Sequence, residues 1–315
     1  MKVLITGGAG FIGSSLAKTL LKAGDDVSLI DHFSSYYHVE RKVEHLEEIK
    51  KNGPISVHRF DLLDADQTLA HFKAYTYDKV IHLAALPGVQ YSLKNPLDYI
   101  DQDIKVVVNV LSAAGETGIP HVLFGSSSSV YGSREEGPVK EEQASGKVKS
   151  PYAAAKAGAE SFCHAYQSLY GFKLTILRFF TVYGPWGRPD MAIPLFIEKL
   201  IKGEEITVYD REQSRDFTYI DDIIQGITLA FKQDGLSEVY NLGSGSPVHL
   251  TELIQLLTQY FPSAKVREDT FRRGDVRHTW GDISKARNEL GYSPEVTFEE
   301  GIRRTIEWAK SYHEL

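Results

Sequence analysis

Short apolar runs alternate with amphipathic stretches through the first half of the chain. The apolar runs have the length of β-strands and occupy residues 3–5, 27–30, 55–60, 79–83 and 122–125. The stretches between them place their apolar positions at helical spacing, at 11–23, 39–51, 64–74 and 96–117. Such alternation is typical of a parallel sheet covered by helices on both faces. With right-handed crossovers it predicts an α/β, Rossmann-type, doubly wound fold, whose ligand crevice lies at the carboxyl ends of the strands.

The alternation loosens after residue 184, where prolines and glycines interrupt the chain. A strand at 174–178 still continues the sheet, but the later apolar runs, at 206–208, 217–219 and 239–242, are shorter. We therefore expect residues 1–184 to form the Rossmann domain. Residues 185–315 should form mainly a smaller α+β lobe, interleaved with that domain. The charges of 42–51 recur at helical spacing and predict a solvated helix face.

The composition restricts the class of ligand. Of the 315 residues, 42% are hydrophobic and 24% are charged, which is ordinary for a soluble globular enzyme. The net charge of −7 argues against a nucleic-acid partner, because nucleic-acid-binding proteins usually carry a basic excess. Six arginines in the C-terminal half instead favour an anionic small molecule: Arg188, Arg211, Arg215, Arg272, Arg273 and Arg277.

The sequence also predicts where the protein resides. Its one cysteine, Cys163, excludes an intramolecular disulfide. Met1 leads directly into the first apolar run, so we expect no signal peptide. No apolar run approaches the roughly 20 residues of a membrane span. We expect a cytoplasmic protein with no membrane partner and no metal site.

A glycine-rich turn follows the first apolar run. Gly8, Gly10 and Gly13 match the G-x-G-x-x-G fingerprint of dinucleotide-binding folds, and Gly7 fits a looser version of it. Glycine allows the tight turn, the close approach of backbone to a pyrophosphate, and close helix packing. The helix that begins near Phe11 would point its free N–H groups at the phosphates.

Acidic residues follow the second and third predicted strands. Asp31 lies where a carboxylate accepts hydrogen bonds from a ribose 2′-hydroxyl and repels a 2′-phosphate, which favours NAD over NADP. Asp61 has two interpretations: it accepts from the adenine amino group, or it is the N-cap of the next helix. His82 is interpreted as a packed histidine at a strand end.

Tyr152 and Lys156 indicate the chemistry. Residues four apart on a helix share a face, and an ammonium held beside a phenol favours the phenolate. The result is a general base that can deprotonate an alcohol while hydride leaves its carbon. The serines of 126–129 follow the fifth strand, at the ligand crevice, where one hydroxyl can bridge substrate and tyrosine.

These segments together resemble the extended short-chain dehydrogenase/reductase family, specifically its nucleotide-sugar epimerases and dehydratases. The motifs TGGAGFIG, HLAA, SSSSVYG, SPYAAAK, RFFTVYGP, SRDFTYIDD and RRGD occur in the family's order over nearly the whole chain. The resemblance implies a tightly held, recycled NAD and a UDP- or TDP-sugar in the C-terminal lobe. The NAD site that it implies comprises Gly7, Gly10, Phe11, Ile12, Gly13, Asp31, Asp61, Leu62, Leu83, Ala84, Ala85, Tyr152 and Lys156.

Within that family, the residues before Val130 favour an epimerase. Sugar 4,6-dehydratases have Asp-Glu where this chain has Ser128 and Ser129, and UDP-glucuronate decarboxylases have Glu in place of Ser129. The stretch 178–192 resembles the UDP-glucuronate 4-epimerases. The implied substrate-binding residues are Ser127, Ser128, Thr181 and Arg188 for the sugar and its carboxylate, Arg215, Arg272 and Asp275 for the UDP, and Thr207 and Tyr209 beside the uracil.

Two residues depart from the family pattern. Gln90 stands where glucuronate epimerases commonly have Arg, which removes a positive charge near the site. Asp103 stands where the family usually has Asn.

The resemblance implies an isomerase, with Tyr152, Lys156 and Ser127 as its catalytic residues. We expect NAD-dependent C4 epimerisation of UDP-glucuronate to UDP-galacturonate through a transient 4-keto sugar. The alternatives are a UDP-glucose or UDP-N-acetylglucosamine 4-epimerase, a UDP-glucuronate decarboxylase, and a non-catalytic NAD-sensing protein on the same fold. In relatives the helices that correspond to 96–117 and to the Tyr152 helix form a dimer interface, so a homodimer is expected.

Overall fold

The main sheet has seven parallel strands. The computed structural model describes residues 1–133, 137–233 and 237–314. Within these residues the spatial order is β11-β6-β5-β4-β1-β2-β3, which confirms the doubly wound prediction. The strand bounds are β1 (Lys2–Thr6), β2 (Asp26–Ile30), β3 (Ser56–His58), β4 (Lys79–His82), β5 (His121–Ser127), β6 (Lys173–Phe179) and β11 (Val239–Leu242).

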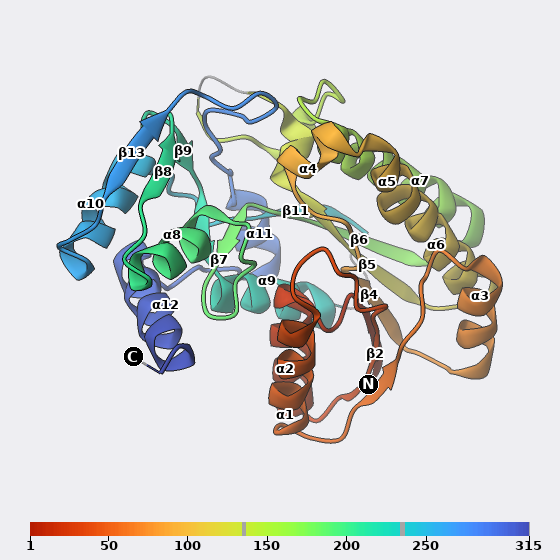
Figure 1. The fold of residues 1–315 in the computed structure, drawn as a ribbon. Coiled ribbons are helices and arrows are strands. Elements are labelled where there is room, and N and C mark those ends of the chain that lie inside the picture. The colour runs from red at the N-terminus through yellow and green to blue at the C-terminus, as the bar shows by residue number, and fades with distance from the viewer. Residues whose placement is uncertain (134–136, 234–236, 315) are drawn as a thin grey trace.

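Helices cover both faces of this sheet because its strands are apolar on both sides (Figure 1). Leu4 and Val80 pack against one layer of helices, whereas Ile5 and Ile81 pack on the opposite face. The first layer consists of α3 (Ala65–Ala74), α6 (Val106–Glu116) and α7 (Pro151–Tyr170). The second layer consists of α1 (Phe11–Lys22), α2 (Val39–Lys50), α9 (Ile220–Lys232) and α11 (Ser284–Leu290).

A smaller lobe lies beside the sheet, at the left of Figure 1. Its helices are α8 (Ala192–Ile201), α10 (Leu250–Tyr260) and α12 (Phe298–Tyr312). Its strands form pairs: β7 (Thr181–Tyr183) with β10 (Phe217–Tyr219), β8 (Ile206–Tyr209) with β13 (Val266–Asp269), and β9 (Ser214–Arg215) with β12 (Val248–His249).

The placement of residues 239–242 in this lobe was wrong. These residues form β11, which extends the main sheet beside β6. Tyr240, Asn241 and Leu242 are fully buried there, between helices on both faces. β11 is thus the edge strand of the main sheet, and its side chains are nevertheless buried by the helices that cover both faces.

The predicted helix 96–117 is present but irregular. It consists of α5 (Pro96–Ile100), a π-helical turn at Asp101–Lys105, and α6. A short helix that the sequence pattern did not predict, α4 (Val89–Lys94), precedes it. Two 3₁₀ turns, Ser128–Tyr131 and Glu141–Gln143, lie between β5 and α7.

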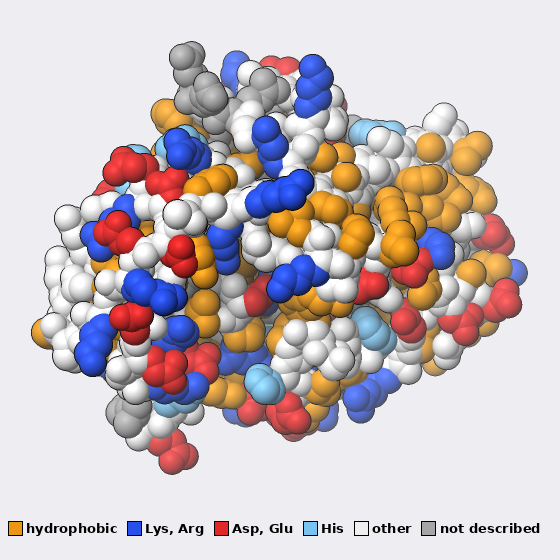
Figure 2. Space-filling view, turned by 45° about the horizontal axis from the view of Figure 1, so that its top comes forward, with side chains coloured by type: hydrophobic (Ala, Val, Ile, Leu, Met, Phe, Trp, Pro, Cys, Tyr) orange, Lys and Arg blue, Asp and Glu red, His pale blue; other side chains and the backbone are white. Residues whose placement is uncertain are grey.

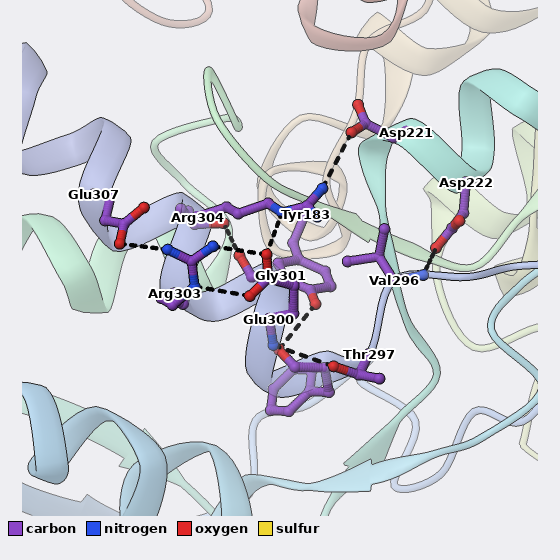
Figure 3. A network of polar contacts seen from close by, with 12 residues as sticks. Tyr183, Asp221, Asp222, Val296, Thr297, Glu300, Gly301, Arg303, Arg304 and Glu307 are labelled. Atoms are coloured by element: carbon purple, nitrogen blue, oxygen red, sulfur yellow. Dashed lines mark hydrogen bonds and ion pairs between the residues drawn. The ribbon is translucent and has the colours of Figure 1, made fainter.

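Polar contacts fasten α12 to the rest of the molecule (Figure 3). Arg304 lies 3.8 Å from Asp221 at the start of α9. Asp222, in the next position, accepts two backbone N–H groups from the segment before α12. Tyr183 of β7 donates its hydroxyl to the Phe298 carbonyl at 3.3 Å. The C-terminal helix is thereby held beside the strand that begins at Thr181.

Candidate active site

A cavity of about 770 Å³ lies at the carboxyl ends of β1, β2, β4 and β5. This is the edge where the strand order reverses between β1 and β4, as expected for a ligand crevice in a doubly wound sheet. Every residue of the implied NAD site lines this one cavity. Four of the implied sugar-binding residues line it as well: Ser127, Ser128, Thr181 and Arg188.

The glycine turn has the geometry that a pyrophosphate needs. Gly7 has φ of +67°, and a Cβ there would lie 2.7 Å from the Ala84 backbone nitrogen. A Cβ at Gly13 would overlap the Gly7 carbonyl oxygen. Helix α1 starts after Gly10, and no side chain caps its first N–H groups in the described residues. The turn therefore offers backbone donors without steric obstruction, and it fits a dinucleotide phosphate.

Asp31 is positioned by three hydrogen bonds. Its Oδ2 accepts from the Ala9 N–H at 3.1 Å, and its Oδ1 accepts from the Phe33 N–H at 2.8 Å and from Lys42 Nζ at 3.0 Å. Both side chains of the ion pair with Lys42 are nearly buried. The prediction of a solvated face at 42–51 is therefore wrong for Lys42, whose ammonium is drawn inward by this carboxylate. That ammonium also offsets part of the repulsion that Asp31 would exert on a 2′-phosphate.

The two remaining predictions at the strand ends are resolved. Asp61 lines the cavity and accepts the Leu63 N–H at 2.9 Å, whereas the N-cap of α3 is Asp64. The N-cap interpretation of Asp61 is therefore wrong. His82 is packed as expected: it is 2% exposed and its Nδ1 lies 2.6 Å from Thr6 Oγ1. Burial lowers the pKa of His82 to about 3, so the ring is neutral.

Tyr152 and Lys156 reach the cavity from the start of α7. The Ser150 hydroxyl accepts the Ala153 N–H and caps this helix, and Pro151 occupies its first position, which fixes where the helix begins. Lys156 is 4% exposed, and its Nζ donates to the Gly125 carbonyl at 3.3 Å. Tyr152 packs edge-on against Tyr99, with ring centroids 5.9 Å apart.

The serine segment carries Ser127 to the same part of the cavity. Its Oγ accepts the Ser129 N–H at 3.2 Å and starts the 3₁₀ turn. The structure thus brings Ser127, Tyr152 and Lys156 to one cavity beside the glycine turn. A hydroxyl donor, a phenol and an ammonium in this arrangement can remove or return a proton at a substrate oxygen.

A buried ion pair between Arg178 and Glu160 forms hydrogen bonds with the residues that flank Ser127 and Ser128. Arg178 of β6 donates from Nε and Nη2 to the two carboxylate oxygens of Glu160, at 2.9 and 2.7 Å. Ser126 donates to the same carboxylate at 2.5 Å. Arg178 also donates to the Tyr131 hydroxyl at 2.9 Å. The backbone on both sides of Ser127 and Ser128 is therefore fixed to a charged pair in the core.

The sugar end of the cavity contains an arginine with a partner. Arg188 donates through Nε and Nη2 to Asp190, at 3.0 and 2.6 Å. Tyr36, which follows β2, donates to the same carboxylate at 3.1 Å. Burial alone would lower the pKa of Arg188, but the ion pair with Asp190 raises it. The guanidinium is therefore charged and directed by Asp190, and its Nη1 makes no bond to that carboxylate.

The other predicted substrate residues form a second group on the small lobe. Arg272 lies 4.4 Å over the Tyr209 ring and donates to Asp275 at 3.2 Å. Burial lowers the pKa of Arg215 to about 10, which leaves it charged near neutral pH. Gln90 of α4 donates to Asp275 at 2.9 Å and so joins this group to the large cavity that α4 lines.

Thr207 is farther from this chemistry. Its hydroxyl accepts from Arg267 at 3.2 Å on the exposed side of β8. Neither Thr207 nor Tyr209 lines the large cavity.

Several lining residues were missed from the sequence. Tyr36, Tyr37, Lys42, Tyr91 and Met191 line the cavity, although the sequence assigned none of them to it. The pair of adjacent tyrosines soon after Asp31 was the sequence signal that could have indicated Tyr36 and Tyr37.

The described residues contain no group of three or more His, Cys, Asp or Glu that could hold a metal ion. Among those residues, none of the helices is both long and apolar enough to cross a membrane.

Comparison with known proteins agrees with this geometry. A model of the GDP-mannose 4,6 dehydratase family matches residues 4–305. A UDP-glucuronate 4-epimerase from Thermodesulfobacterium geofontis is 39% identical over 315 residues, which cover 99% of this chain and 97% of the relative. The chain also resembles the structure of UDP-glucuronic acid 4-epimerase from Bacillus cereus in complex with UDP-glucuronic acid and NAD. That structure has a TM-score of 0.93 and 35% identity, and the match covers 99% of this chain and 100% of the other.

A neutral-sugar enzyme is also similar. The structure of a UDP-glucose 4-epimerase with UDP-glucose from Thermotoga maritima has a TM-score of 0.91 and 30% identity, and the match covers 99% and 100% of the two chains. The family match spans almost the whole chain and includes the glycine turn and the Tyr-x-x-x-Lys helix. The chain therefore belongs to the GDP-mannose 4,6 dehydratase family of the extended short-chain dehydrogenases/reductases.

Proposed function

We propose that this protein is an NAD-dependent UDP-sugar 4-epimerase that converts UDP-glucuronate to UDP-galacturonate. The observation that carries the proposal is one cavity that holds the glycine turn, the set Ser127, Tyr152 and Lys156, and the charged Arg188. The relatives described as UDP-glucuronate 4-epimerases support this substrate.

The residues divide the chemistry between them. Tyr152 removes the proton from the C4 hydroxyl, and the Lys156 ammonium stabilises the phenolate. Ser127 donates to the same oxygen and holds it as it becomes a ketone. Bound NAD supplies the hydride acceptor and donor. The 4-keto sugar turns about its diphosphate anchor between the two transfers, so that C4 presents its opposite face for the return of the hydride. Tyr152 returns the proton to the C4 oxygen.

A uronic acid places a further demand on the site. Its 4-keto intermediate is a β-keto acid, which loses carbon dioxide when the carboxylate is free to turn. Ser127, Ser128 and Thr181 offer hydroxyl donors, and Arg188 offers a guanidinium, which suits carboxylate geometry. Together these groups hold the carboxylate away from the orientation that permits decarboxylation.

The diphosphate is assigned to the small lobe. Arg215 and Arg272 supply positive charge, and Asp275 accepts from the ribose. Gln90 orients Asp275 through their hydrogen bond and so connects the ribose site to α4. Thr207 and Tyr209 lie beside the uracil in this proposal, with Tyr209 stacked under Arg272.

A neutral hexose is the second candidate substrate, because the carboxylate of Asp190 offsets the positive charge of Arg188 and Gln90 adds no charge. The test is incubation of the purified protein with UDP-glucuronate, UDP-glucose and UDP-N-acetylglucosamine in parallel, with products followed by NMR. UDP-galacturonate without pentose or carbon dioxide is the expected result. Epimerisation of the neutral sugars alone would transfer the assignment to a hexose, and pentose would indicate a decarboxylase.

The Arg188→Met variant isolates the carboxylate contact. We expect its KM for UDP-glucuronate to rise by roughly tenfold to a hundredfold, since a hydrogen bond to a charged group is lost. The KM for UDP-glucose should change far less, and an equal rise for both sugars would contradict the assignment.

The proposed assembly is a homodimer through α5, α6 and α7. Figure 2 shows hydrophobic side chains gathered on the face that these helices form. Leu97 and Leu169 are 74% and 73% exposed there, and Ile100, Phe162 and Tyr170 are also exposed. Such a patch is typical of a protein interface. Sedimentation of wild type and of Leu97→Lys would test the dimer.

A cytoplasmic location stays a prediction from the sequence, to be tested by cell fractionation.

A further inference from the structure

Asp103 is a buried carboxylate beside the catalytic lysine. It lies in the π-helical turn Asp101–Lys105 and is 1% exposed. Its Oδ1 accepts the Leu86 N–H at 2.6 Å. Its Oδ2 has no hydrogen-bond partner among the described residues and lies 3.9 Å from Lys156 Nζ. One oxygen therefore supports the backbone, and the other faces the ammonium.

Most of the groups packed around Asp103 and Lys156 are neutral, and the nearest other charge that acts on Tyr152 and Tyr99 is Arg188. Tyr152 and Lys156 approach from α7, Tyr99 from α5 and His82 from β4. Burial raises the pKa of Tyr99 and lowers the pKa of His82 to about 3, so both are neutral near pH 7. Phe124 lies beneath Lys156, with its ring 5.2 Å from Nζ. The field at the Tyr152 phenol thus depends on Lys156, on the Arg188 guanidinium that interacts with it, and on the charge of Asp103.

We propose that Asp103 is a positioning residue that acts through Lys156 and sets the pH at which Tyr152 becomes an effective base. The proposal rests on the function proposed above. An anion beside Lys156 holds the ammonium in place and offsets part of the positive field that stabilises the phenolate. While Asp103 is charged, Lys156 therefore favours the Tyr152 phenolate less strongly than it would alone.

The carboxylate of Asp103 itself changes charge close to neutral pH. Burial raises the pKa of Asp103 to about 6, although Lys156 and the Leu86 N–H both act to lower it. Below that pH Asp103 becomes neutral, and the positive field at Tyr152 increases. The charge of Asp103 is therefore coupled to how strongly Lys156 favours the phenolate of Tyr152.

Backbone support alone does not require this charge. An asparagine amide has nearly the same shape, and its carbonyl oxygen can accept the Leu86 N–H as Asp103 does. The Asp103→Asn variant therefore removes the charge and keeps the bond to the backbone. Its effect on the pH dependence of the reaction separates the role of the charge from a structural role.

The experiment compares wild type, Asp103→Asn and the exposed control Glu116→Gln. The pH profile of kcat/KM is measured with UDP-glucuronate and with UDP-glucose. We expect the midpoint of the acid limb to move to lower pH by on the order of one unit in Asp103→Asn. The control should match wild type, and the Tm of Asp103→Asn should stay close to that of wild type.

A second measurement does not depend on the substrate. The near-ultraviolet absorbance of phenolate is titrated in the NAD-bound protein, and the difference between each form and its Tyr152→Phe counterpart isolates Tyr152. The midpoint of this titration should again be lower in the Asp103→Asn protein than in wild type. An unchanged or higher midpoint overturns the proposal. If neither sugar is turned over but the phenolate midpoint shifts as expected, the proposed function fails and the role of Asp103 stands.

Discussion

Replacing Glu160 with glutamine should destabilise the protein strongly. Glu160 receives two bonds from Arg178 and one from Ser126, and both side chains of the ion pair are less than 10% exposed. Glutamine keeps one of the two acceptor oxygens and directs an amide N–H₂ at a guanidinium donor. The charge of Arg178 is then buried without a counterion, which costs about 3–5 kcal/mol of unfolding free energy.

Urea unfolding of the protein without ligands measures this cost. With a slope of about 3 kcal/mol/M, the midpoint of Glu160→Gln should fall by roughly 1 M or more with the slope unchanged. The matched control is Glu307→Gln, because Glu307 pairs with Arg303 on the exposed side of α12 (Figure 3). That midpoint should not change measurably, since exposed pairs contribute little.

A double variant tests the cause. The double variant Glu160→Leu with Arg178→Met removes both charges. It should lower the unfolding free energy by less than the sum of the two single changes, because each single change leaves one buried charge unpaired and the double change leaves none. A midpoint for Glu160→Gln equal to that of wild type would refute the reasoning that the buried pair holds the serine segment.

Three further changes follow from the described geometry. Tyr152→Phe should lower kcat for epimerisation by on the order of 10²–10⁴ while calorimetry still detects NAD binding, and wild-type turnover would contradict the assigned base. In Gly13→Ala the new methyl overlaps the Gly7 carbonyl, so the unfolding free energy should fall by about 1–3 kcal/mol and NAD should bind more weakly. Gly158→Ala, whose methyl meets one side-chain carbon at 3.5 Å, is its control and should be neutral or stabilising. Stability should also fall as pH is lowered from about 6.5 to about 4. Burial lowers the pKa of His45 to about 4, so in this window the unfolded chain binds a proton that the folded chain does not, worth up to roughly 3 kcal/mol. His82 contributes in the same direction over this window and Asp103 in the opposite direction, so the contribution of His45 is the difference between wild type and His45→Asn. The urea midpoint of His45→Asn should depend less on pH, and an equal dependence would contradict the assignment of a neutral, buried His45.

The fold was predictable because its strands are short, apolar and separated by helical spacing. The main-sheet strands before residue 180 were all found within a few residues of their bounds. The π-helical turn at Asp101–Lys105 was not predicted, because one wider turn changes the spacing of apolar residues too little to be distinguished from a regular helix. The assignment of 239–242 failed because a four-residue apolar run carries no information about which sheet it joins.

The site was predictable where residues are close in sequence. Gly7 to Gly13, and Tyr152 with Lys156, lie within single turns or helices, so their proximity follows from local geometry. The burial of Lys42 depends on Asp31 in another element, and the charge pattern of its helix indicated only a solvated face. The buried ion pair of Arg178 could have been predicted from the sequence, because a single charged residue in an apolar strand needs a buried partner of opposite charge.

The return of β11 to the main sheet affects how the chain folds during synthesis. β6 ends at Phe179 and its neighbour starts at Val239, so roughly 60 residues must follow before the sheet is complete. At about 5–20 residues per second, the edge of β6 stays unpaired for several seconds on the ribosome. An open, apolar edge is a template for pairing with another nascent chain. Slow translation between residues 180 and 239 should therefore lower the yield of folded protein more than an equal delay after residue 242.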